Sequence, residues 1–183
     1  MSVWKYFKDW FYRLKSVGEQ IRSSSESPMF YIRSVTIKGN RLFTTCFLKS
    51  KLNFSPTQMY SFDDIYNKIW FSEKGDDIAS LYMNKGYLFF DVELIPKEID
   101  SQTLDITLKV TEGDIYKIGD VTVTGLFCQD LGERILFKRG ERFSRLKVKQ
   151  TYENLLSIEA KPIKITPKAN KNTRVVDVDI QVG

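Results

Sequence analysis

The chain has 183 residues, 42% hydrophobic and 28% charged, a composition suited to packed cores and too apolar for a disordered chain. Its net charge of +5 is spread along the sequence without a dense basic block, so nucleic-acid binding is not expected. The absence of histidine, with only Cys46 and Cys128 as cysteines, excludes Ser-His-Asp and Cys-His catalysis and His-containing zinc sites.

Residues 1–29 differ in character from the rest of the chain. Residues 1–22 carry apolar side chains at helical spacing with basic residues among them, which predicts an amphipathic basic helix. Trp4, Phe7, Trp10 and Phe11 would contact either a membrane surface or a protein partner. The Ser23–Ser27 run predicts a flexible tether. No stretch of the sequence reaches the roughly 20 apolar residues of a membrane-spanning helix, and any export signal is expected upstream.

Residues 30–113 predict a strand, two helices and a pair of strands. Alternating apolar residues indicate the strands, and helical apolar spacing indicates the helices. The strands are expected at about Ile32–Asn40, Tyr87–Ile95 and Thr103–Val110, and the helices at about Thr44–Leu52 and Ser61–Asn84. Ser61 with Asp64 resembles a capping box at the start of the long helix, and Gly86 suits its end.

Residues 114–183 repeat this order. Val35, Ile37 and Gly39 match three residues located 86 positions later, namely Val121, Val123 and Gly125. The elements are expected at about Ile118–Leu126, Gln129–Phe137, Ser144–Ser157, Ile163–Pro167 and Thr173–Val182. Each repeat is therefore β-α-α-β-β. We predict an elongated, two-lobed α+β protein, in which each lobe is a three-stranded mixed sheet with two helices on one face.

Three motifs carry a resemblance to a known family. They are "IKGN" at the end of the first strand, "LYMNKGYLFFDV" at the end of the long helix, and "VTEGDIYKIGDVTVTG" between the repeats. Over about Phe30–Gly183 the chain resembles consecutive POTRA domains of BamA-type proteins, with the Bacteroidetes form closest. The resemblance implies domains at 30–113 and 114–183, and the short turn Glu112, Gly113 and Asp114 between them is too short to be a loose linker. Leu126 stands where the family usually has Asn, which leaves a divergent paralogue open.

The resemblance also implies a function. POTRA domains lie on the periplasmic side of an outer membrane and bind unfolded outer-membrane proteins and accessory assembly lipoproteins, without enzymatic activity, metal or cofactor. The expected mode is β-augmentation, in which an extended client pairs with an unpaired strand edge. In the family the second strand of each domain is an edge. The edge residues expected here are Tyr87, Leu88, Phe89, Phe90, Asp91, Val92, Glu93, Leu94 and Ile95.

Each of these assignments has an alternative. The aromatic residues of the edge could fill the core instead, and the second edge has Pro162 and Pro167, which remove donors, so the first domain is favoured for client binding. The module could also belong to a secretion transporter or a division protein. An enzyme would need carboxylates such as Asp63–Asp64 or Asp76–Asp77, for which solvated helix faces or turns are the simpler explanation. Each cysteine is expected to be a small buried side chain, and a disulfide between them stays open.

Overall fold

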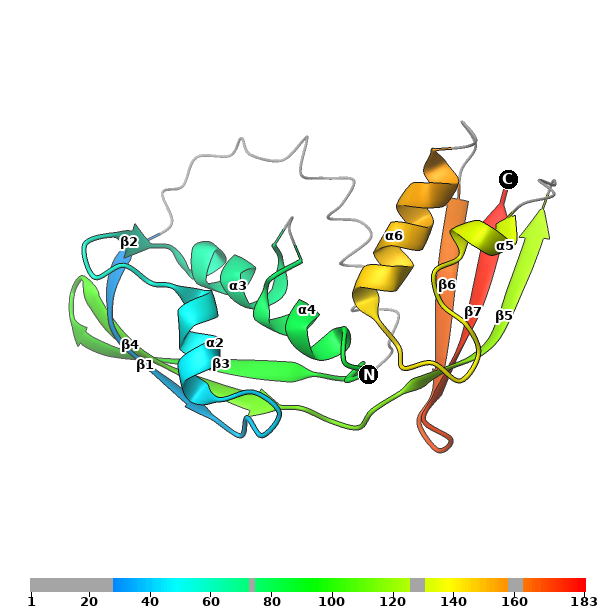
Figure 1. Ribbon diagram of the computed structural model, residues 1–183. Coiled ribbons are helices and arrows are strands. Elements are labelled where there is room, and N and C mark those ends of the chain that lie inside the picture. Colours follow the sequence, from blue (N-terminus) through cyan, green and yellow to red (C-terminus); the bar gives the residue numbers. More distant parts are fainter. Residues whose placement is uncertain (1–27, 73–74, 126–130, 158–162) are drawn as a thin grey trace.

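The computed structural model describes residues 28–72, 75–125, 131–157 and 163–183. These residues form two separate sheets, each with helices packed on one face (Figure 1). We call the elements from β1 to β4, Phe30–Thr111, the N-lobe and the elements from β5 to β7, Lys117–Val182, the C-lobe. Each lobe has a hydrophobic core of its own, as predicted for a two-lobed α+β molecule.

The N-lobe sheet has four strands in the order β2-β1-β4-β3. The strands are β1 Phe30–Lys38, β2 Met59–Tyr60, β3 Asp91–Asp100 and β4 Thr103–Thr111, and the helices are α2 Thr45–Leu52, α3 Phe62–Trp70 and α4 Ile78–Met83. Strand β1 runs parallel to β4, and β3 forms an antiparallel hairpin with β4. Three strands were predicted. The fourth, β2, pairs with two residues of β1 and is too short to show alternation in the sequence.

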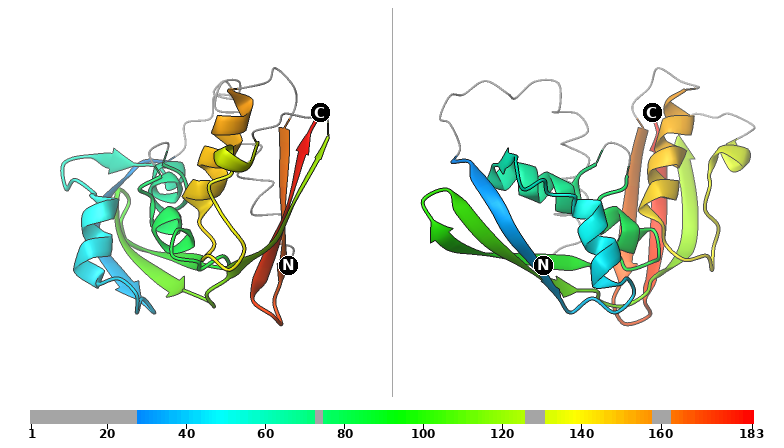
Figure 2. Two further views of the ribbon diagram at one scale, coloured as in Figure 1. Left: turned by 45° about the vertical axis from the view of Figure 1, so that its right-hand side comes forward. Right: turned by 60° about the vertical axis from the view of Figure 1, so that its left-hand side comes forward.

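The C-lobe sheet has three strands in the order β5-β7-β6. The strands are β5 Lys117–Gly125, β6 Ile163–Asn170 and β7 Val175–Val182, and the helices are α5 Leu131–Arg134 and α6 Arg145–Leu156. Strand β5 runs parallel to β7, and β6 runs antiparallel to it, so the predicted mixed sheet is confirmed. Figure 2 shows α6 lying along one face of this sheet.

The central strands have the inward faces that alternation predicts. In β4 the side chains of Leu104, Ile106 and Leu108 are buried, while the residues between them face outward. In β7 the same holds for a second set of alternating residues, Val176, Val178, Ile180 and Val182. The period of two therefore places each sheet against its helices.

The long helix predicted from Ser61 to about Asn84 is wrong, because the segment forms two helices. Helix α3 ends at Trp70 and α4 begins at Ile78. Gly75 adopts a φ of 69°, and the carboxylate of Asp77 caps α4 by accepting the Ser80 N–H at 2.7 Å. Helical apolar spacing occurs on both sides of the break, with Ile65 and Ile69 before it and Ile78, Leu81 and Tyr82 after it, and this led to the prediction of one helix.

The structure contains the helix caps predicted at Ser61 and Ser144, but the helix expected at Gln129–Phe137 is limited, among the described residues, to α5 Leu131–Arg134. The Asp64 N–H donates to Ser61 Oγ at 3.1 Å and the Ser61 N–H donates to the Asp64 carboxylate at 2.8 Å, which completes the capping box of α3. Gly86, with a φ of 97°, follows α4. Ser144 caps α6 as expected.

Other expectations have different outcomes. Cys46 is exposed rather than buried, because it lies in the first turn of α2 on the side away from the core. Cys128 and the N-terminal residues Trp4, Phe7, Trp10 and Phe11 lie outside the described residues. Within the ranges that the structure describes, no helix has the length and apolar character needed to cross a membrane.

Candidate binding edge

Strand β3 lies at the edge of the N-lobe sheet. Among the described strands it pairs with β4 alone, so one side of its backbone has no strand beside it. The strand was expected at Tyr87–Ile95, but it begins at Asp91 and continues through Pro96 to Asp100. Tyr87–Phe90 do not belong to β3, because they form the tight turns that connect α4 to this strand.

The position of Pro96 indicates which backbone groups of β3 face away from the sheet. Pro96 lies opposite Ile106 in an antiparallel register that is continuous from Asp91 to Glu98. Proline has no N–H, and in an edge strand it is accommodated where that group would face solvent. Outward and inward positions alternate along an antiparallel strand. We therefore infer that Val92, Leu94 and Glu98 point their N–H and C=O groups outward, and that Pro96 interrupts this row of donors.

The side chains of β3 provide apolar contacts on both faces of the sheet. Val92 and Leu94 are half-buried against the N-lobe core. On the open face, Ile95 is 43% exposed. Glu93 forms an exposed ion pair with Lys109, whose Nζ lies 3.3 Å from the carboxylate. A strand added beside β3 would therefore meet apolar side chains on either face.

The equivalent edge of the C-lobe, β6, carries a proline at the same place. Pro167 lies opposite Val178, and it follows Ile163 by four residues, as Pro96 follows Val92. Proline was expected to affect only the second edge, but the structure places one inside each edge strand. The open face of β6 differs from that of β3, because Lys164, Thr166 and Lys168 occupy it. Lys168 pairs with Asp179 across the strands at 2.5 Å.

The turn residues between α4 and β3 pack in two directions. Tyr87 and Phe90 contact the N-lobe core. Leu88 is 4% exposed and belongs to the C-lobe core, and the Phe89 ring lies 5.1 Å from the ring of Tyr116. The core-packing alternative therefore holds for Phe90 and, across the lobe junction, for Leu88 and Phe89.

The turn Glu112, Gly113 and Asp114 lies in the connection between β4 and β5. The buried Glu112 carboxylate accepts the N–H groups of Arg41 at 2.6 Å and Leu42 at 2.8 Å. Gly113 has a φ of 74°. Asp114 pairs with Arg174 of the C-lobe at 3.3 Å. The connection is thus attached to both lobes.

The open face of the N-lobe sheet also carries a charge pair. The Arg33 guanidinium donates to both carboxylate oxygens of Asp105, with Nε 3.0 Å and Nη2 2.5 Å away. Hydrogen bonding from Arg33 lowers the pKa of Asp105 to about 2. This pair links β1 to β4 and lies on the exposed face of the sheet.

In each of the acidic pairs Asp63–Asp64 and Asp76–Asp77, one residue makes structural contacts and does not simply face solvent. Asp64 belongs to the capping box, whereas Asp77 is buried and lies 3.6 Å from Arg145 of α6. The expectation that Asp76 and Asp77 are solvated is wrong for Asp77, because the break before α4 turns it toward the C-lobe. Sequence reasoning missed Arg145, which is one of several basic residues in its region. Within the described ranges, no three His, Cys, Asp or Glu side chains are grouped as metal ligands.

Comparison with known proteins agrees with this architecture. Residues 30–113 match the sequence model of the POTRA family, described as a surface antigen variable number repeat. A candidate outer membrane protein assembly factor of Treponema pallidum (strain Nichols) is 25% identical over 139 residues, which are 71% of this chain. The chain spans 16% of the length of that relative.

Two solved structures extend the likeness to the second lobe. POTRA3-5 of Haemophilus influenzae BamA is 15% identical with a TM-score of 0.61, covering 88% of this chain and 68% of that one. BamA of Haemophilus ducreyi lacking POTRA domains 1-3 is 19% identical with a TM-score of 0.67, covering 84% and 29%. Residues 30–113 therefore match the POTRA family, and both lobes have a fold similar to that of the BamA POTRA domains. Closeness to the Bacteroidetes form stays a prediction.

Proposed function

We propose that this chain is the periplasmic POTRA module of an outer-membrane protein assembly factor, and that β3 holds extended segments of unfolded outer-membrane proteins. POTRA domains of BamA are non-enzymatic, which agrees with the prediction that this chain is not an enzyme. The Treponema relative is named as an outer membrane protein assembly factor, and this name supports the proposed role in outer-membrane protein assembly. The unpaired edge of β3 is the observation that carries the proposed mode of binding.

Backbone pairing suits clients that share no sequence. An extended client offers N–H and C=O groups at every residue, so it can add to β3 whatever its side chains are. Strands of a membrane barrel alternate apolar and polar residues. Such a strand could direct its apolar side chains toward Val92 and Leu94, which already contact the N-lobe core.

The row of outward donors limits where a client can pair. Val92 and Leu94 precede Pro96, so continuous pairing is confined to the first half of β3, about Asp91–Ile95. The first half of β6 is less suitable, because charged lysine side chains protect strand edges from pairing and Lys164 lies there. We therefore place the client at the N-lobe edge. Accessory assembly lipoproteins are further proposed partners, and the domain boundary is proposed at residues 113 and 114.

The proposal is tested by titrating an isotope-labelled chain with an extended peptide of alternating apolar and polar residues. Amide shifts are expected to cluster on β3. Val92→Pro removes one outward donor and is expected to weaken binding about 2- to 10-fold, the range for losing one hydrogen bond. Glu93→Ala, whose side chain is exposed and whose N–H faces β4, is the matched control and should bind like the wild type.

Two results would contradict edge pairing. One is a set of shifts confined to the helices. The other is a folded Val92→Pro variant, verified by an unchanged amide spectrum of β4 and β1, that binds as tightly as Glu93→Ala. A secretion or division module with the same edge would be distinguished by the sequence that follows the two domains in the full-length protein.

A further inference from the structure

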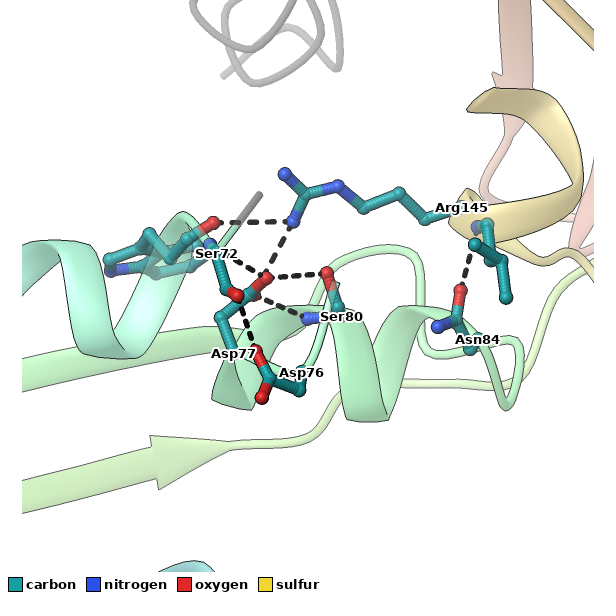
Figure 3. A network of polar contacts seen from close by, with 8 residues as sticks. Ser72, Asp76, Asp77, Ser80, Asn84 and Arg145 are labelled. Carbon is teal, nitrogen blue, oxygen red and sulfur yellow. Dashed lines mark hydrogen bonds and ion pairs between the residues drawn. The ribbon is translucent and has the colours of Figure 1, made fainter. Parts of the chain in front are cut away.

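The break between α3 and α4 receives a side chain from the other lobe. Arg145, the first residue of α6, extends its guanidinium into this break (Figure 3). Its Nη1 lies 3.6 Å from Asp77 Oδ1 and donates to the Trp70 carbonyl oxygen at 3.3 Å. Trp70 is the last residue of α3. One guanidinium therefore bridges the end of one helix and the start of the next.

The pair is withdrawn from solvent, unlike the other charge pairs of the described residues. The side chains of Asp77 and Arg145 are 0% and 11% exposed. Asp77 also accepts from the Ser80 hydroxyl at 2.7 Å and from the Ser72 N–H at 3.2 Å, so its carboxylate is held in place. Burial lowers the pKa of the Arg145 guanidinium and the charge of Asp77 opposes that change. Arginine stays charged in such surroundings.

A second polar contact lies beside the pair. Asn84 follows α4, and its side-chain oxygen accepts the Leu146 N–H at 2.7 Å and contacts Ser144 Oγ at 3.3 Å. The Leu146 N–H is one of the first N–H groups of α6, which lack partners within the helix. The end of α4 thus caps the start of α6.

A separate contact point lies next to the connection between the lobes. The Tyr116 N–H donates to the Gly86 carbonyl at 2.8 Å, and Leu88 is inserted in the C-lobe core. In Figure 1 the connection runs along the sheets, whereas α4 meets α6 in the helix layer. One contact point beside the connection would leave rotation of the lobes open. Contacts in both layers would restrict such rotation.

We propose that Arg145 is a positioning residue. By holding the start of α6 against the break between α3 and α4, it fixes the angle between the two sheets. The consequence is a defined arrangement of the edges β3 and β6, held by one charged side chain and the cap at Asn84. The inference goes beyond client binding and does not depend on it, because the angle can be measured without a client.

The test is a spin-label distance measurement on the full chain without client. Labels are placed at Cys46, which is exposed on α2, and at Glu153→Cys, which is exposed on α6. Cys128→Ser leaves these as the two labelled positions. The parent protein is expected to give one narrow distance distribution. Arg145→Met should broaden or shift it, and Arg145→Lys should fall between them because lysine lacks the guanidinium fork.

Two further variants separate the charge pair from general stability. Asp77→Asn removes the charge but keeps a good helix cap, so it should broaden the distribution while α4 stays formed, and it decides the question if Arg145→Met does not fold. Arg139→Met breaks an exposed pair with Asp120 inside the C-lobe, at 2.7 Å, and should leave the distances unchanged. An unchanged narrow distribution in folded Arg145→Met or Asp77→Asn, or equal broadening in Arg139→Met, would overturn the proposal.

Discussion

The two lobes follow one pattern but differ in the segment before their strand hairpins. In the C-lobe this segment ends in one 12-residue helix, α6. In the N-lobe it forms a helix of 9 residues and another of 6, separated by a turn that contains Gly75 and Asp77. The first turn of the continuous helix lies at the interface, where polar groups at the ends of the two shorter helices contact it. The helix segments that differ between the repeats thus meet at the junction of the lobes. The features that the repeats share form the sheets.

The common features lie at matching positions of both sheets. Gly39 and Gly125 end the first strand of each lobe with positive φ and lie against the carbonyls of Val110 and Val182. A proline interrupts the edge strand of each lobe in the same register. The glycines allow the first strand to lie close to its neighbour, and the prolines restrict backbone pairing at the sheet edge.

The largest effect is expected from Leu88, an N-lobe residue buried in the C-lobe core. Leu88→Ala should destabilise the protein by about 2 to 5 kcal/mol, the usual range for truncating a buried leucine. Hydrogen exchange should show the loss mainly in β5, β6 and β7. Leu52→Ala, at a fully buried N-lobe position, is the matched control and should expose β1 and β4 instead. Loss of protection confined to the N-lobe in Leu88→Ala would mean that the residue does not support the second core.

A smaller effect is expected at the paired glycines. Gly39→Ala and Gly125→Ala each force a side chain into positive φ, which costs about 1 to 3 kcal/mol, and a Cβ would also collide with a carbonyl oxygen of the neighbouring strand. Denaturant unfolding measures the change. Gly140→Ala separates the two causes, because Gly140 has a φ of 85° with nothing within 4 Å of a Cβ. If all three variants lose equal stability, contact with the neighbouring strand contributes nothing.

The smallest effect is a pH dependence limited to the N-lobe. The pKa of Asp105 is lowered from 3.8 to about 2, so its contribution to stability is present above pH 3.8 and is lost as the pH falls through about 2. Carboxyl NMR titration measures this pKa directly. Asp105→Asn should reduce the loss of N-lobe stability between pH 4 and 2, with little effect on the C-lobe. A midpoint near 3.8 for Asp105 would show that the Arg33 pair does not persist in solution.

The sequence by itself determined the features that depend on neighbours along the chain. Alternation in β4 and β7 sets which residues face the helices, because successive side chains of a strand point to opposite faces. The capping box at Ser61 and Asp64 involves residues three positions apart, so it can be recognised locally. The repeat of these local patterns was enough to predict two α+β lobes.

Only the tertiary structure decided the features that depend on what lies opposite. Leu88 and Phe90 belong to one short apolar stretch, yet they enter different cores, because the turn after Gly86 directs them to opposite sides. Asp77 and Arg145 are 68 positions apart, as 145 − 77 shows, and nothing in their local sequences distinguishes them from solvated charges. Their burial follows from the placement of α6 against the break between α3 and α4, since a side chain's exposure is set by the surfaces that close over it.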